Sequence, residues 1–173
     1  NPGVTNLIDT RSNKHTLLAQ AENPFADYLV PSVETGTIKA ADDVSDLHYR
    51  IIKPADFDET KQYPVVIYVY GGPHSQLVQN RWRYGSGGWE FYMAQRGHIV
   101  FVLDNRGTAN RGFEFENVTH RQLGVEEAKD QMRGVEYLKS LPYVDADRMG
   151  IHGWSYGGFM TINMLLRNPD VFK

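Results

Sequence analysis

The chain has 173 residues, of which 41% are hydrophobic and 23% charged, and its 18 Lys and Arg against 21 Asp and Glu give a net charge of −3. This is the composition of an ordinary globular domain, and it lacks the excess of basic side chains that nucleic acids and anionic membranes attract. No apolar run approaches the roughly 20 residues of a membrane-spanning helix. The lack of cysteine excludes disulfides, thiolate metal sites and cysteine nucleophiles.

The first third of the chain is predicted to form two β-hairpins. Residues 1–33 combine a short apolar stretch, a polar turn and a loose segment with prolines, which predicts a strand pair followed by a connector. Residues 35–41 and 47–53 alternate apolar and polar side chains around a polar turn. This alternation indicates an antiparallel hairpin with one solvated face.

The rest of the chain predicts strands that alternate with helices. Continuous apolar runs are typical of strands that a parallel sheet buries on both faces, and apolar positions at helical spacing predict helices. The predicted elements are a strand over 65–70, a helix over 89–95, a strand over 99–103, a helix over 125–141, a strand over 148–152 and a helix over 156–167. A long loop around residues 107–112 separates the second strand from the second helix. The pattern therefore predicts an α/β fold with a mainly parallel sheet flanked by helices.

The strongest chemical signal lies between the last predicted strand and helix, where the sequence reads Gly153-Trp154-Ser155-Tyr156-Gly157-Gly158. A nucleophile on a sharp strand-to-helix turn has strained backbone angles, and the residues two before and two after it come too close for side chains. The turn also places the serine at a helix N-terminus, where free N–H groups favour the negative charge of acyl transfer. The pattern predicts Ser155 as a nucleophile, with a flexible glycine turn as the alternative.

A second signal follows the strand over 65–70, where the chain reads Tyr70-Gly71-Gly72-Pro73-His74. In hydrolases of this architecture the loop after the corresponding strand supplies one donor to the oxyanion, and the N–H of the residue after the nucleophile supplies the other. The phenol of Tyr70 and the N–H of Tyr156 are therefore predicted oxyanion donors. The alternative is a tyrosine used for packing before a glycine turn.

The remaining polar clusters predict no cofactor. The six histidines show no i, i+4 spacing and have no cysteine nearby, so a metal site is not expected. Residues 85–88 resemble a phosphate loop but lack the preceding strand and the third glycine, so a plain loop is the preferred interpretation. Residues 81–83 could stack on a nucleic-acid base, although a solvated loop with one buried aromatic ring is simpler.

Four segments together closely resemble the prolyl oligopeptidase family, with dipeptidyl peptidase IV and the bacterial prolyl tripeptidyl peptidases as the nearest branch. They are the two motifs above, the second extended to Ser75-Gln76, together with Asp104-Asn105-Arg106-Gly107 and Arg121-Gln122-Leu123-Gly124. The likeness runs from about residue 34 to the end of the chain. It implies an α/β-hydrolase fold preceded by a β-propeller, with residues 1–33 as the propeller tail and connector and 34–173 as the first half of the catalytic domain.

The resemblance also implies an activity and roles for individual residues. Members of the family remove short N-terminal peptides after proline, so proline-containing peptides are the expected partners and no cofactor is required. By this likeness Ser155 is the nucleophile, and Tyr70 and the Tyr156 N–H form the oxyanion hole. The Tyr156 ring helps to line the proline pocket, and Arg106 forms structural ion pairs. The resemblance suggests an exported bacterial enzyme and leaves the oligomeric state open, a homodimer included.

The sequence departs from the family in one respect. In α/β-hydrolases the triad order is Ser, Asp, His, yet only 18 residues follow Ser155 and all six histidines precede it. Asp170 lies too soon after the nucleophile helix for the acidic role. We therefore expect the triad Asp and His to be absent from this chain and the chain alone to be inactive. We also expect the rest of the domain, or another chain, to cover the strand over 148–152 and the apolar helix after it.

Two other activities fit the same residues. An acyl-peptide hydrolase or esterase would use the same fold and serine, and a non-catalytic homologue would keep the fold without turnover. The choice between dipeptide and tripeptide release stays open, because residues that grip the substrate amino terminus in the resembled enzymes lie outside this sequence.

Overall fold

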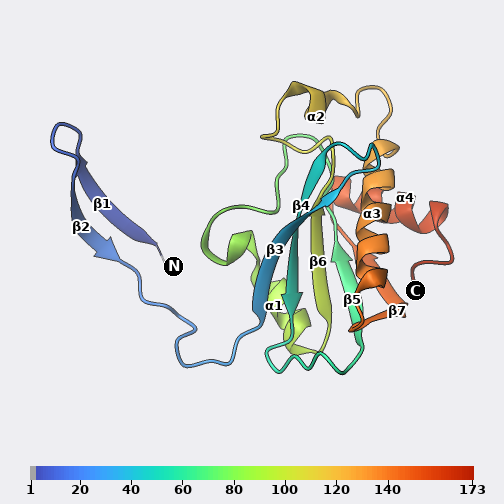
Figure 1. Ribbon diagram of the computed structural model, residues 1–173, viewed down its shortest axis with the longest axis horizontal. Helices are drawn as coiled ribbons and strands as arrows, with labels where there is room; N and C mark the ends of the chain where they lie inside the picture. The colour runs from blue at the N-terminus through green and yellow to red at the C-terminus, as the bar shows by residue number, and fades with distance from the viewer. Residues whose placement is uncertain (1–2) are drawn as a thin grey trace.

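The computed structural model describes residues 3–173, which form two separate β-sheets and the helices around the larger one (Figure 1). The elements in chain order are β1 (Val4–Asp9), β2 (Lys14–Gln20), β3 (Ser32–Lys39), β4 (Asp46–Lys53), β5 (Tyr63–Tyr68), the 3₁₀ turn η1 (Trp82–Gly85), α1 (Gly88–Gln95), β6 (Ile99–Asp104), α2 (Phe113–Asn117), α3 (Glu126–Ser140), β7 (Val144–His152) and α4 (Tyr156–Arg167). Among the helices of residues 3–173, none has the length and apolar character needed to cross a membrane.

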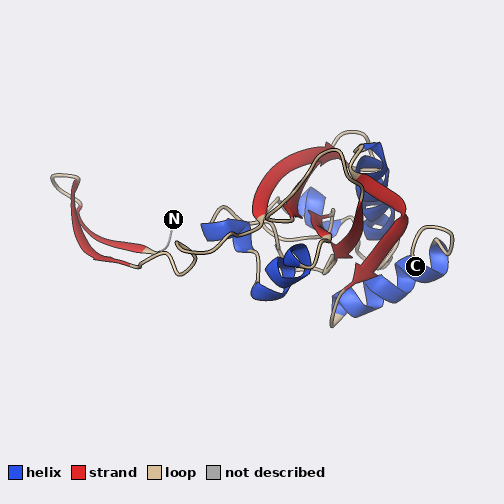
Figure 2. Ribbon diagram, turned by 90° about the horizontal axis from the view of Figure 1, so that it is seen from below, coloured by secondary structure: helices blue, strands red, loops and turns tan. Residues whose placement is uncertain are grey.

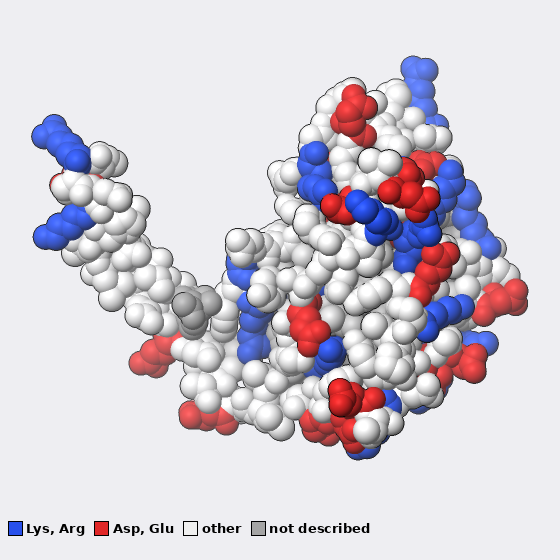
Figure 3. All heavy atoms as spheres, in the orientation of Figure 1, with Lys and Arg blue, Asp and Glu red and all other residues white. Residues whose placement is uncertain are grey.

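The first two strands form an antiparallel hairpin that extends away from the rest of the chain (Figure 1). Every residue of both strands is exposed. In the view of Figure 3, few charged side chains lie along the hairpin between its turn and its base. Its exposed large apolar residues are Val4, Leu7, Ile8, Leu17 and Leu18. The predicted strand pair and connector are confirmed, and none of the hairpin's large apolar residues is fully buried.

The second sheet has five strands in the order β3-β4-β6-β5-β7. The predicted second hairpin is confirmed as β3 and β4, which pair antiparallel, and β4 continues antiparallel onto β6. β5 lies between β6 and β7 and is parallel to both. The sheet is therefore mixed, with its parallel part at β6, β5 and β7. The carboxyl ends of these three strands meet at one edge of the sheet, where ligands of open α/β sheets bind.

Helices cover both faces of this sheet (Figure 2). On the face covered by α1, Ala94 packs against the fully buried Ile52 and Val100. On the other face α3 and α4 pack against a larger core. Its fully buried members from strands and helices include Leu47, Ile67, Phe101, Leu138, Met160 and Met164. This three-layer arrangement confirms the predicted α/β class, and the helices predicted over 89–95, 125–141 and 156–167 all form. The prediction of a mainly parallel sheet is wrong for the described strands, because β3 and β4 pair antiparallel and β4 joins β6 antiparallel.

Three boundaries differ from the prediction. β5 ends at Tyr68 and not at residue 70, and its side chains alternate between buried and half-buried because the short α1 leaves one face partly open. β7 starts at Val144, earlier than the predicted 148, and its pairing with β5 is irregular over 145–148, where the side chains are polar. The loop after residue 107 contains α2, a five-residue helix that follows Gly112. Polar and short elements of this kind carry no clear apolar periodicity.

β7 and α4 have surfaces that no described residue covers. β7 pairs with β5 on one side, and no described strand pairs with its other side. α4 places buried Met160 and Met164 toward the sheet, while Ile162 and Leu166 are 60% and 77% exposed. The predicted cover for this strand and helix stays a prediction, and the structure defines the apolar surface that it would bury.

Candidate active site

Ser155 lies at the turn between β7 and α4 in a backbone conformation that L-residues rarely adopt, with φ 56° and ψ −122°. A Cβ atom at Gly153 or at Gly157 would collide with the carbonyl oxygen of Val69. Both glycines are therefore required by the close approach of this turn to the end of the neighbouring strand β5. The strained angles of Ser155 persist because the surrounding backbone fixes them, a feature that clusters at functional sites.

The hydroxyl of Ser155 is accessible. The residue is exposed, and its side chain makes no capping hydrogen bond to α4. Its carbonyl oxygen instead accepts hydrogen bonds from the N–H groups of Gly158 and Phe159 at 2.9 and 3.2 Å, which start the helix. The first N–H groups of a helix have no intrahelical acceptor, so the N–H of Tyr156 is available to a negatively charged ligand beside Ser155.

Tyr70 lies beside this turn because β5 and β7 are adjacent parallel strands. The N–H of Val69 donates to the carbonyl oxygen of His152 at 2.9 Å, so the two strands stay paired up to the start of both loops. The ring centroid of Tyr70 is 6.4 Å from that of Trp154 and 6.3 Å from that of Tyr156. The structure thus brings together the two motifs that the sequence separates by 85 positions.

Buried side-chain amides fix the loop after Tyr70 through hydrogen bonds. The side-chain amide of Asn105 donates to the carbonyl oxygen of Gly71 at 3.0 Å, and Gln131 of α3 donates to the Asn105 side-chain oxygen at 2.8 Å. Gly71 has a φ of +73°, a conformation that favours glycine. At Gly72 an added Cβ would lie 2.7 Å from the ring of Tyr156, so this backbone packs directly on the ring.

The hydroxyl of Tyr156 donates a hydrogen bond to Oε1 of the buried Glu127 at 2.7 Å. Burial and this bond to a carboxylate raise the pKa of Tyr156, since both disfavour the phenolate. The ring also contacts Phe159 edge to face, with centroids 5.2 Å apart. The residue after Ser155 is therefore fixed at its backbone by the helix and at its ring by three neighbours.

Arg106 forms the structural ion pairs that the resemblance implies. Its guanidinium bonds Asp130 through Nε at 2.9 Å and Nη2 at 2.8 Å, and it also contacts Glu126 at 3.0 Å and Asp42 at 3.3 Å. Hydrogen bonding to the Asp130 side chain raises the pKa of Arg106 above its ordinary value. The cluster joins the β3–β4 turn, the loop after β6 and α3, and it makes no contact with Ser155.

A second buried ion pair secures the chain beyond the Tyr70 loop. Nη2 of Arg50 lies 2.7 Å from Oε1 of Glu90, and Nη1 donates to the carbonyl oxygens of Leu77 and Tyr84. Asp104 accepts N–H bonds from residues 77 and 78, while burial raises its pKa to about 6. Sequence reasoning missed the buried pair of Arg50 and Glu90, because Arg50 stands among other polar residues of an alternating strand and carries no local signal of burial.

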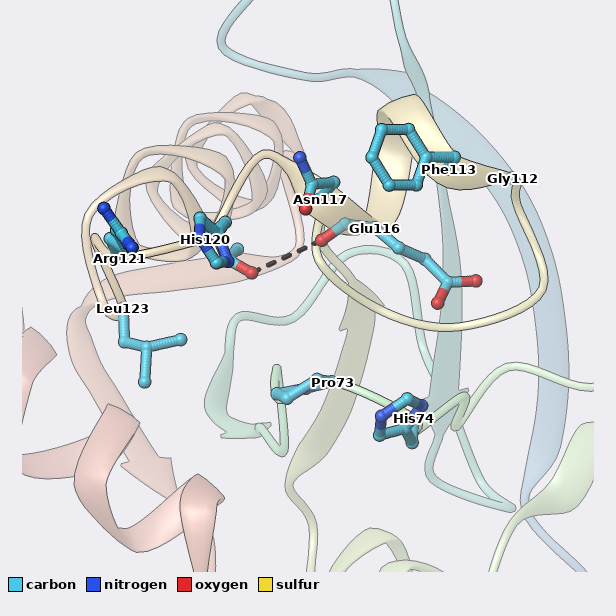
Figure 4. Close-up of a pocket in the computed structure, with 10 residues that line it drawn as sticks. Pro73, His74, Gly112, Phe113, Glu116, Asn117, His120, Arg121 and Leu123 are labelled. Atoms are coloured by element: carbon cyan, nitrogen blue, oxygen red, sulfur yellow. Dashed lines mark hydrogen bonds between the residues drawn. The ribbon is translucent and has the colours of Figure 1, made fainter.

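A cavity of about 860 Å³ adjoins the Tyr70 loop (Figure 4). In the close-up, Pro73 and His74 lie on one side of it, and residues of α2 and the loop that follows lie on the other. The lining residues are Pro73, His74, Gly112, Phe113, Glu116, Asn117, Thr119, His120, Arg121 and Leu123. Neither Tyr70 nor Ser155 is among these residues, so the cavity lies beside the loop that follows Tyr70 and not at the serine itself.

Residues 85–88 connect η1 to α1, as expected for a loop, whereas the expectation of a buried aromatic ring within residues 81–83 is wrong, since Trp82 lies in the 3₁₀ turn η1 and is 38% exposed. Glu90 in the first turn of α1 accepts a hydrogen bond from the N–H of Gly87 at 2.7 Å, so a carboxylate of the chain occupies the helix N-terminus where a phosphate would bind. Within residues 3–173, no group of three His, Cys, Asp or Glu side chains is arranged to hold a metal ion. His152 stacks near Trp89 with ring centroids 4.8 Å apart.

Comparison with known proteins gives a consistent set of relatives. Residues 85–173 match the family model of the prolyl oligopeptidase family. Human dipeptidyl peptidase 8 is 37% identical over 163 residues, which cover 91% of this chain and 17% of that protein. A crystal structure from Bacteroides ovatus, described as a dipeptidyl aminopeptidase IV, superposes with a TM-score of 0.96 at 59% identity, over 98% of this chain and 24% of that one. Porphyromonas gingivalis dipeptidyl peptidase 4 gives a TM-score of 0.84 at 38% identity, with the same coverage. The chain thus spans about a quarter or less of the length of these relatives.

Proposed function

Because the chain belongs to the prolyl oligopeptidase family, we propose that it carries the nucleophile and the oxyanion donors of a serine exopeptidase that releases N-terminal dipeptides or tripeptides after proline. The observation that carries the proposal is the exposed Ser155 on a strained turn directly beside Tyr70. A structural turn has no need of an accessible hydroxyl in such a conformation. The match to the prolyl oligopeptidase family supports proline peptides as the substrate class, and the dipeptidyl peptidases among the relatives support the release of dipeptides.

In the proposed reaction Oγ of Ser155 attacks the carbonyl carbon of the substrate proline, at the peptide bond that is cleaved. A general base takes the hydroxyl proton, and the tetrahedral oxyanion accepts hydrogen bonds from the phenol of Tyr70 and the N–H of Tyr156. As this intermediate collapses, the protonated base gives its proton to the leaving amine of the remaining peptide, and a prolyl ester stays on Ser155. Water, deprotonated by the same base, then hydrolyses the ester and releases the peptide as a carboxylic acid. We assign the general base and its carboxylate to residues outside 1–173, so the chain alone is expected to be inactive.

The proposal also assigns the parts of the chain to larger units. Residues 34–173 would form the first half of an α/β-hydrolase domain, with the nucleophile after β7 and an oxyanion donor after β5. Residues 1–33 would be the tail of a propeller domain and its connector, and the separate exposed hairpin of β1 and β2 supports that assignment. The order of strand β7, nucleophile turn and helix α4 supports the assignment to a hydrolase fold.

Active-site labelling of the full-length protein that carries these residues tests the proposal. A fluorophosphonate probe reacts with an activated serine, and mass spectrometry of the digested protein locates the adduct. We expect a single adduct on the peptide containing Ser155. Hydrolysis of dipeptidyl-proline and tripeptidyl-proline anilides, compared with acylated peptides and esters, then separates the exopeptidase from the two related hydrolases. An unlabelled protein, or an adduct on another serine, overturns the proposal.

Replacement of Tyr70 by phenylalanine should lower kcat for proline anilides by about 10²- to 10³-fold with little change in KM, because removal of one oxyanion donor affects the transition state alone. Steady-state kinetics of the full-length protein measure both constants. Tyr92→Phe is the matched control, since that phenol lies exposed on α1. A Tyr70→Phe variant with unchanged kcat would remove this phenol from the oxyanion site.

A further inference from the structure

Glu127 is a buried acid that the proposed reaction does not use. Its exposed fraction is 0%, and it lies in the first turn of α3, where free N–H groups favour negative charge. The neighbouring acids Glu126 and Asp130 both pair with Arg106, whereas no described Lys, Arg or His lies within ion-pair distance of Glu127. Its Oε2 atom is buried and accepts no hydrogen bond from the described residues.

Such a group is costly to keep. A buried carboxylate with one unpartnered oxygen loses its hydration without full compensation, and an apolar side chain at the same position would avoid that loss. The bond that Glu127 does make is the one from the hydroxyl of Tyr156, the residue directly after the nucleophile. The expensive group is thus connected to the reaction centre by one hydrogen bond.

The ring of Tyr156 connects Glu127 to the loop that follows Tyr70, because its hydroxyl bonds Glu127 while its ring packs against the loop. The ring lies against the backbone of Gly72, so closely that a methyl group there would overlap it. Gln131, one helical turn after Glu127 on the same face of α3, holds Gly71 through Asn105. Two side chains of one helix therefore support two successive residues of the same loop from behind.

We propose that Glu127 is a positioning residue that holds the Tyr156 ring against Gly72, and thereby fixes the two oxyanion donors and the proline-contacting ring relative to Ser155. This inference rests on the proposed function. Small displacements of donors at a reaction centre have large effects on rate, because the barrier depends on the geometry at which charge develops. The buried carboxylate is retained for this contact and not for an ion pair.

Kinetics of full-length variants test the inference. Glu127→Ala and Tyr156→Phe should each lower kcat for proline anilides by about 10- to 100-fold and reduce the preference for proline over alanine at the cleaved position. Glu127→Gln should retain most of the wild-type rate, since its amide oxygen can still accept the phenol. The double variant Glu127→Ala with Tyr156→Phe should be no slower than either single one, because both remove the same contact.

Tyr137→Phe is the matched control. Its phenol is half-buried on the same helix and bonds the hydroxyl of Tyr49 at 2.7 Å, away from the reaction centre, so its loss should leave the proline preference unchanged. If the wild-type protein is neither labelled nor active, the proposed function fails and this inference fails with it. If the wild type is active and Tyr156→Phe behaves like Tyr137→Phe, or if the double variant shows additive losses, the positioning role alone is wrong. Since Tyr156→Phe keeps the ring, the test stands even if Glu127→Ala does not fold.

Discussion

Ser155→Ala is expected to lower kcat/KM of the full-length protein for proline anilides by about 10⁵- to 10⁶-fold, the loss seen when a serine hydrolase loses its nucleophile. The remaining rate would come from binding and the oxyanion donors alone. The thermal midpoint should stay close to that of the wild type, because the hydroxyl is exposed and caps no helix. Activity and unfolding measured on the same preparations separate loss of chemistry from loss of fold.

The matched control for this substitution is Ser140→Ala. That serine lies at the end of α3, where its hydroxyl donates to the carbonyl oxygen of Tyr137 on the surface. We expect full activity from this variant. A Ser155→Ala protein whose kcat/KM for proline anilides falls by much less than about 10⁵-fold would contradict the serine mechanism, whatever the labelling experiment gives.

Asp130→Ala should destabilise the fold by about 3–5 kcal/mol, the cost of leaving a buried charge without its partner. Asp130 is fully buried and accepts four hydrogen bonds, from the N–H of Ala41 and from the backbone N–H, Nε and Nη2 of Arg106. Its removal leaves the Arg106 guanidinium without its main partner and removes the hydrogen bond that ties the β3–β4 turn to α3. Urea unfolding followed by a probe in this domain measures the loss, and the exposed Asp147→Ala should have almost no effect.

A double variant sharpens this prediction. Asp130→Leu combined with Arg106→Met removes both charges together, so no buried charge is left unpaired, and part of the lost stability should return. If the double variant is no more stable than Asp130→Ala, the damage comes from the lost hydrogen bonds between Asp130 and the backbone N–H groups and not from the unpaired guanidinium.

Apolar pattern accounts for the elements that could be predicted from the sequence. β6 is buried along its whole length, and its run of five apolar residues admits no other reading at that length. The helix α4 forms within the predicted bounds because Asn168-Pro169 ends its apolar run. β7 could not be bounded in the same way. Its first half is polar and irregularly paired, so its strand character depends on β5 and is invisible in local sequence.

The residues of the candidate site also fall into those with a signal in the sequence and those without one. The sequence places Ser155 and Tyr70 beside each other because each follows a strand of the parallel part of the sheet and lies next to glycines that a tight turn requires. The supporting residues Glu127, Asn105 and Gln131 could not be predicted, since an acid or amide in a helix or loop ordinarily indicates a solvated surface. The i, i+3 spacing of Glu126 and Lys129 favours a surface pair, which forms at 2.6 Å, yet Glu126 also contacts Arg106. Burial of polar groups is set by tertiary packing.

The edge of β7 that no described strand pairs with and the exposed apolar face of α4 should affect the behaviour of residues 1–173 when they are produced alone. A strand with unsatisfied backbone groups recruits a second copy, and the adjacent exposed Ile162 and Leu166 would add to that attraction. We expect such a polypeptide to accumulate as insoluble aggregates at ordinary expression levels. We therefore expect residues 1–173 to need further protein surface over β7 and α4 in order to stay in solution.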